Sequence, residues 1–126
     1  IKYSNFDKLD NPQVIESISK NKQTKKNIKY DDKGNILKLT EITYNNGTKV
    51  IKKTEFTSYK YDQYNNVIEL LRSSVPKMEY PIKMIGGPHL YENEFYKYKY
   101  NKDGLWTKKV CIINGNESYI WKREYK

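Results

Sequence analysis

The chain has 126 residues, which fits one domain, and its 24 Lys and Arg against 15 Asp and Glu give a net charge of +9. It has no alanine and 13 tyrosines, so its composition argues against a helical fold and favours strands. One cysteine excludes an internal disulfide, one histidine argues against zinc sites and His-based catalytic triads, and no apolar run is long enough to span a membrane.

Four segments share one six-residue pattern: an aromatic residue, Asp or Asn, two variable residues, and then Gly, Asn or Asp before the last position. They are Phe6–Asn11, Tyr30–Asn35, Tyr61–Asn66 and Tyr100–Leu105. We interpret each segment as a turn in which the aromatic residue ends a strand and the Asp or Asn side chain accepts from a backbone N–H two residues on. The fifth residue is expected at positive φ, as in a type I turn with a G1-type bulge. These fifth residues are Asp10, Gly34, Asn65 and Gly104.

The turns divide the chain into strands, predicted in chain order at 1–6, 24–31, 35–44, 48–62, 66–74, 91–101, 105–113 and 117–125. Residues 12–20 stay open between a strand, which the turn register favours, and a short helix starting after Pro12. Asn45-Asn46-Gly47 and Asn114-Gly115-Asn116 predict hairpin turns between the repeated ones. The sequence therefore predicts an all-β fold: an antiparallel β-meander of about 8–9 strands built from degenerate Tyr-Asp hairpin repeats. We expect one domain over residues 1–126, as a twisted open or curled sheet (a partial barrel).

Residues 75–90 interrupt this pattern with three prolines and the pair Gly86-Gly87. Such a segment forms neither a continuous helix nor a central strand, so we predict a Pro/Gly-rich insertion loop. Its length, and the presence of His89, mark it as a candidate functional insertion or a flap over the sheet.

Alternation of side chains predicts two different sheet faces. Tyr96 and Tyr98 point to one face and Lys97 to the other, while Trp106, Val110 and Ile112 are expected to share a face. One aromatic and one Lys-rich face is typical of a sheet with one buried side. A single layer cannot bury that side by itself, so the sheet is expected to curl, to be covered by the loop, or to pair with a second copy.

The sequence offers few residues that could carry out catalysis. Cys111, between two aliphatic residues, is expected to be a small buried hydrophobe. The carboxylates Glu92 and Glu94 are expected to be solvated, and Asp31-Asp32 to serve turn chemistry. We therefore predict no enzyme, no cofactor and no metal site.

The four turns resemble the YD-type repeat of Rhs-like and wall-associated bacterial surface proteins, and also the small secreted bacterial β proteins of unknown function. The segment from Tyr98 to Lys109 is most similar, with Asn101 in place of Asp and Leu105 in place of Asn. The resemblance implies a periplasmic, cell-surface or extracellular setting, together with carbohydrate or protein binding.

The leading functional hypothesis is a non-enzymatic envelope or secreted module that binds a glycan or a protein partner. The candidate ligand-binding residues are Tyr96, Tyr98, Trp106, Trp121 and His89, with core packing as the alternative role for the aromatic ones. One alternative function is a homodimer or an inhibitor-type interaction subunit without a small-molecule ligand. Another is weak polyanion binding through surface Lys. Specific nucleic-acid recognition is not expected, because only Arg72 and Arg123 are arginines.

Overall fold

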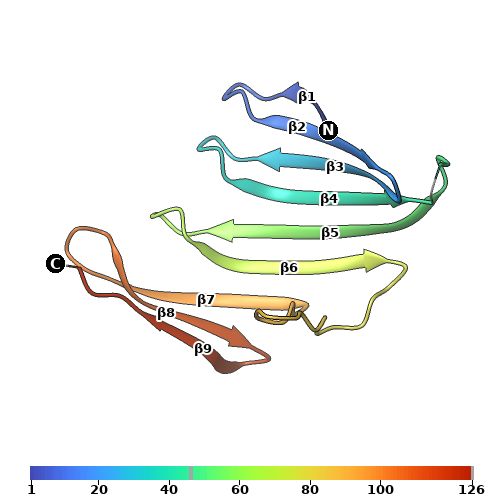
Figure 1. Ribbon diagram of the computed structural model, residues 1–126. Helices are drawn as coiled ribbons and strands as arrows, with labels where there is room; N and C mark the ends of the chain where they lie inside the picture. The colour runs from blue at the N-terminus through green and yellow to red at the C-terminus, as the bar shows by residue number, and fades with distance from the viewer. Residues whose placement is uncertain (46, 126) are drawn as a thin grey trace. The chain divides into compact units, whose positions relative to one another are not determined.

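The computed structural model describes residues 1–45 and 47–125, and it is all β (Figure 1). The strands are β1 (Lys2–Phe6), β2 (Pro12–Ser19), β3 (Lys22–Tyr30), β4 (Ile36–Tyr44), β5 (Ile51–Tyr61), β6 (Val67–Val75), β7 (Asn93–Tyr100), β8 (Trp106–Ile113) and β9 (Asn116–Lys122). They form one antiparallel sheet in the order β1 to β9, which confirms the predicted meander. The two end strands are not paired with each other in the described residues, so the sheet is open. The described part of the chain has no helix long and apolar enough to cross a membrane.

The strand boundaries settle the one open assignment of the sequence. Of residues 12–20, Pro12–Ser19 form β2, with Pro12 as its first residue opposite Phe6, where a missing N–H costs least. β9 ends at Lys122, opposite Lys108 and earlier than the predicted 125, and beyond it the backbone N–H of Arg123 still donates to the Thr107 carbonyl at 2.9 Å. Asn46, in the predicted hairpin turn before β5, lies outside the described residues.

The chain divides into two compact units. Unit 1 comprises Ile1–Ser58 and Arg72–Glu79, and unit 2 comprises Tyr59–Leu71 and Tyr80–Lys126. Strands β1 to β4 therefore belong to unit 1, and β7 to β9 belong to unit 2. The single domain expected from chain length stays a prediction.

All four repeated turns close through the same hydrogen bonds. In the second turn, Asp31 Oδ1 accepts from the backbone N–H groups of Lys33 (2.9 Å) and Asn35 (2.8 Å). Corresponding bonds are made by Asp7, Asp62 and Asn101. The fifth residue has positive φ each time, at 61° for Asp10, 86° for Gly34, 63° for Asn65 and 77° for Gly104. The predicted turn geometry is confirmed at all four positions.

Tyrosine hydroxyls connect one turn to the turn before it. The Tyr30 hydroxyl donates to the Pro12 carbonyl, 2.8 Å away and directly after the first turn. The Tyr100 hydroxyl donates to the Asp62 carboxylate and accepts from the Asn66 side-chain amide at 3.1 Å, both in the third turn. In the second and fourth turns, the aromatic residue therefore does more than end its strand, because it also bonds to the preceding turn or the residue directly after it.

A bulge follows the fourth turn and corrects one prediction about the sheet faces. The register shifts between Lys99 and Tyr100, so that Tyr100 lies opposite Trp106 while Lys97 lies opposite Val110. Trp106 is consequently on the tyrosine face, with its ring 6.4 Å from that of Tyr98. Val110 and Ile112 lie on the opposite, Lys-bearing face. The prediction that Trp106 shares a face with them was wrong, because a strict period of two does not allow for the extra residue.

The buried core of the described residues is small. Its apolar members are Val110, Cys111 and Ile113, all on β8, so the prediction that Cys111 is a small buried hydrophobe is confirmed. No strand forms in the predicted loop between Val75 and Asn93, although Ile82 and Leu90 exchange two backbone hydrogen bonds of 2.7 and 2.9 Å. The loop residues Tyr80, Pro81 and Tyr91 line a cavity of about 100 Å³ together with Ile113. Part of the loop thus lies against the end of β8.

Candidate functional site: an aromatic face and a polar groove

The four aromatic residues singled out from the sequence lie on one face of β7–β9. The strand register places Tyr98 opposite Lys109, and Lys109 opposite Trp121. Tyr96 lies one row along, opposite Cys111, and Trp106 lies opposite Tyr100. The structure therefore brings together Tyr96, Tyr98, Trp106 and Trp121, which we call the aromatic face.

Two cations of the chain itself cover ring faces in this set. Lys109 Nζ lies 4.8 Å from the Tyr96 ring centroid and 4.9 Å from that of Trp121, while Arg123 Cζ lies 3.8 Å from the Trp106 ring centroid. These are cation–π distances, which stabilise the rings in place. Burial lowers the pKa of Lys109. An external ligand would have to compete with Lys109 and Arg123 for these ring faces.

The tyrosine hydroxyls of the aromatic face are also engaged. Tyr96 donates to Glu94 Oε1 at 3.0 Å, and Tyr98 donates to the Val67 carbonyl at 2.8 Å. The prediction that Glu94 is solvated was wrong, because this residue lies buried in β7, opposite Leu70 of β6. Burial raises the pKa of Tyr98 to about 12, and burial together with the Glu94 charge raises the pKa of Tyr96 further. Both phenols therefore remain protonated donors at neutral pH. These contacts give the aromatic face a structural role.

His89 has a local partner in the insertion loop. Its Nδ1 accepts from the backbone N–H of Met84 at 3.2 Å, which ties together the two sides of the loop tip. Ile85, next to Met84, is fully exposed. No contact joins His89 to the four aromatic residues within the described part of the chain.

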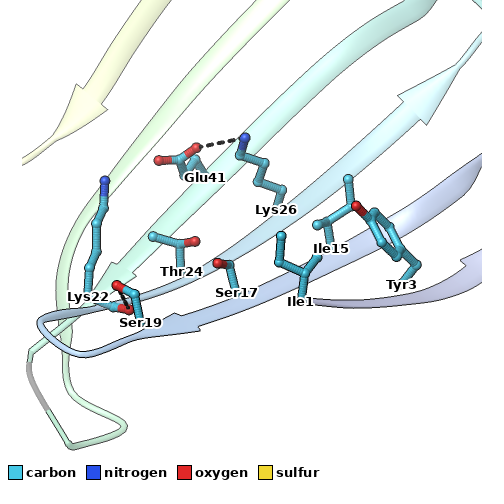
Figure 2. A pocket seen from close by; sticks show the side chains of 9 residues that line it. All are labelled: Ile1, Tyr3, Ile15, Ser17, Ser19, Lys22, Thr24, Lys26 and Glu41. Carbon is cyan, nitrogen blue, oxygen red and sulfur yellow. Dashed lines mark hydrogen bonds and ion pairs between the residues drawn. The ribbon is translucent and has the colours of Figure 1, made fainter.

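A groove in unit 1 was not predicted from the sequence. It has a volume of about 380 Å³ and lies over β1–β4, where side chains from four strands point to one side (Figure 2). Tyr3 and Ile15 form its apolar part, and Ser17, Ser19 and Thr24 contribute hydroxyls. The register explains this convergence, since Tyr3 lies opposite Ile15 and Ser17 lies opposite Thr24.

Charged groups of both signs complete the groove. Lys26 Nζ lies 3.6 Å from Glu41 Oε2, as Figure 2 shows, and Lys22 stands at the end near Ser19. Glu55 lies opposite Glu41 in the register and is itself 3.1 Å from Lys53, so each carboxylate has its own lysine. The groove thus offers ammonium donors, carboxylate acceptors and hydroxyls, which act as both.

The described residues contain no group of three or more His, Cys, Asp or Glu side chains placed to hold a metal ion. The signal for the groove was present in the sequence as the alternation Ile15, Ser17, Ser19 and Lys22, Thr24, Lys26, but only the strand register shows that these sets face one another.

Comparison with known proteins adds no further assignment. No family model matches the sequence, and neither the curated proteins nor the solved structures give a match.

Proposed function

We propose that this protein is a non-enzymatic binding module of the cell envelope or extracellular space, and that the groove over β1–β4 takes a neutral oligosaccharide. The observation that carries the proposal is the composition of the groove wall. An exposed tyrosine ring, three hydroxyls and an ion pair line one concave surface of about 380 Å³. Small-molecule sites commonly fall between about 300 and 1,000 Å³.

Sugars match this lining in two ways. A pyranose ring presents apolar C–H faces, and the Tyr3 side chain, with an exposed fraction of 52%, has a ring available to stack on them. Sugar hydroxyls both donate and accept, so they can bond to Glu41 as donors and to Lys26 as acceptors. Lys26 and Glu41 neutralise each other, so the part of the groove away from Lys22 has no excess charge and favours a neutral ligand over an ionic one.

The groove is a better candidate than the aromatic face because the Tyr3 ring is exposed and no cation of the described residues lies over it. Tyr96 and Trp121 already contact Lys109, and Trp106 contacts Arg123. The envelope setting is supported by the resemblance of the four turns to the YD-type repeat of bacterial surface proteins.

The test is an array of neutral hexose and N-acetylhexosamine oligosaccharides, followed by calorimetric titration of the best binder. We expect Tyr3→Ala and Glu41→Gln each to weaken binding about tenfold or more. Phe95→Ala, which removes an exposed aromatic ring from unit 2, is the matched control and should bind as the wild type does. Failure of the wild type to bind any neutral glycan, or full binding by Tyr3→Ala, would overturn the proposal.

Self-association is a second candidate function, favoured by the other face of unit 1. Ile18 and Ile51 belong to one cross-strand row, Ile18–Gln23–Tyr44–Ile51, and their exposed fractions are 75% and 55%. Large aliphatic side chains grouped on an exposed sheet face are typical of interaction surfaces. We propose that a second copy of the chain covers this row.

A further inference from the structure

Three lysines form one row across β7, β8 and β9 on the side of the sheet opposite the aromatic face. Lys99 lies directly opposite Lys108, and Lys108 lies directly opposite Lys122. Directly opposed residues in antiparallel strands have Cβ atoms about 4.5–5.5 Å apart. We call these three residues the lysine row. Figure 1 shows the three strands that carry it.

Such a row costs stability, because like charges directly opposite each other repel. In the third turn, the lysine at the same position of the motif is neutralised by an acidic residue on the neighbouring strand. There the residue before the turn tyrosine is Lys60, and it pairs with Glu69 at 3.4 Å. Lys99 precedes Tyr100 in the same way, and Lys108 occupies the position that corresponds to Glu69. The fourth turn thus has a lysine where the third has the acid that neutralises the charge.

No acidic side chain in the described part of the chain pairs with the lysine row. None of its three members forms an ion pair in the described residues. Lys99 and Lys122 are exposed and Lys108 is half-buried, so all three ammonium groups can reach solvent. The next row on this face, Lys97–Val110–Ile120, adds a fourth positive charge and the exposed aliphatic side chain of Ile120, whereas Val110 is buried. The result is a basic surface with an apolar border.

We propose that the lysine row binds an acidic polysaccharide, with one sugar carboxylate at each ammonium group. Its three residues lie directly opposite one another, so their backbone positions repeat at the strand spacing of about 4.8 Å. A polyuronate carries one carboxylate on every ring, and the flexible lysine stems allow the ammonium groups to reach carboxylates of successive rings. Beside the row, the Ile120 side chain, with an exposed fraction of 53%, can contact the C–H face of one of the same sugar rings.

Nucleic acid fits the lysine row less well. Duplex DNA places its charges far more densely, about one per 1.7 Å of axis, and its specific readout relies on the planar fork of arginine. No arginine belongs to the row. The lysine row lies in unit 2 and the oligosaccharide groove in unit 1, so this inference does not rest on the proposed function.

The experiment titrates the full chain with oligogalacturonate at low and high salt. The triple variant Lys99→Ser, Lys108→Ser, Lys122→Ser should lose about tenfold or more in affinity. The control removes the same charge from exposed lysines elsewhere, as Lys20→Ser, Lys33→Ser, Lys52→Ser, and should stay within about twofold of the wild type. Equal losses in the two triple variants would show that only net charge matters and would overturn the proposal. Tyr3→Ala should leave oligogalacturonate binding unchanged, which separates this site from the groove.

A single substitution distinguishes lost binding from lost folding. Lys108→Glu recreates the arrangement of Lys60 and Glu69, so it should weaken oligogalacturonate binding while leaving the melting temperature equal or higher. Stronger binding of the wild type to single-stranded DNA, or to phosphatidylserine vesicles, than to oligogalacturonate of equal charge would also overturn the proposal. The proposal would likewise be overturned if Lys108→Glu bound oligogalacturonate as tightly as the wild type.

Discussion

The hydroxyl of Tyr100 donates a hydrogen bond to the carboxylate of Asp62, which joins the fourth repeated turn to the third. Asp62 Oδ1 meanwhile accepts from the backbone N–H groups of Tyr64 and Asn66, so each carboxylate oxygen has a separate task. One oxygen shapes its own turn and the other receives the tyrosine of the next turn. This relationship gives a physical reason for tyrosine and aspartate to occur together in the motif.

Removal of that hydroxyl should cost stability. Tyr100→Phe removes the hydroxyl that donates to Asp62 Oδ2 and accepts from the Asn66 side-chain amide, in a half-buried site. We expect a loss of about 1–3 kcal/mol in the free energy of unfolding, measured by urea titration. Tyr44→Phe is the control, since its half-buried hydroxyl makes no hydrogen bond within the described residues, and it should change the free energy by less than about 0.5 kcal/mol. Equal losses of stability in Tyr100→Phe and Tyr44→Phe would refute the hydrogen bond between Tyr100 and Asp62.

Gly104 should be less tolerant of a side chain than Gly115. Both have positive φ, 77° and 79°, so alanine is strained at either position. A Cβ at Gly104 would also lie 3.0 Å from Tyr64 Cε1, whereas a Cβ at Gly115 meets nothing within 4 Å. We expect Gly115→Ala to cost about 1 kcal/mol and Gly104→Ala to cost about 1 kcal/mol more, by the same urea titration. If Tyr64→Ala fails to reduce the difference, the close approach is not its cause.

Acid should destabilise the protein through the turn carboxylates. The hydrogen bond from the backbone N–H of Asn11 holds the pKa of Asp7 below its usual value near 3.9. The folded state therefore binds fewer protons than the unfolded state in this range, so stability is full above pH 4 and falls as the pH drops through the lowered pKa. Asp7→Asn should show a shallower loss in urea titrations between neutral and acidic pH, and Asn101 shows that an amide can occupy this position. An identical pH dependence in the variant would contradict the assignment.

Lys109 should stabilise the aromatic face. Lys109→Met keeps most of the apolar stem but removes the ammonium group from the Tyr96 and Trp121 rings. We expect a loss of about 0.5–1 kcal/mol in thermal or urea unfolding, together with a change in tryptophan fluorescence. Lys97→Met on the opposite face is the matched control and should leave the fluorescence as it is. No fluorescence change in Lys109→Met would show that the cation does not rest on Trp121.

Self-association should depend on the aliphatic row of unit 1. Light scattering over a concentration series should show a mass above 15.1 kDa for the wild type. The double variant Ile18→Ser, Ile51→Ser should shift the mass toward the monomer, because it removes the exposed apolar surface. A monomeric wild type at every concentration would exclude this interface.

The local parts of the fold were predictable because their causes are local. An Asx side chain followed by a positive-φ residue specifies the turn within six residues, so Asp31 and Gly34 identified it without any knowledge of the partners. The strand at residues 12–20 was harder, since Pro12 is compatible with a helix start as well as with a strand start. Pairing with β1 and β3 decided it.

The sites were less predictable because they depend on register between strands. The four aromatic residues were expected on one sheet. The position of Lys109 between Tyr98 and Trp121, however, is set by the pairing of β7, β8 and β9, which no single strand sequence reveals. The bulge after Tyr100 reversed the expected face of Val110, which no simple alternation reveals. Residues from four strands line the groove, so the sequence of any one strand does not indicate a binding site.

The most direct test of the account is a nuclear magnetic resonance titration of the full chain with the neutral oligosaccharide that the array selects. The account predicts chemical-shift changes concentrated at Tyr3, Ser17 and Thr24, with the resonances of Trp106 and Trp121 unmoved. Changes centred on the two tryptophans, with the groove residues unaffected, would contradict the proposed site.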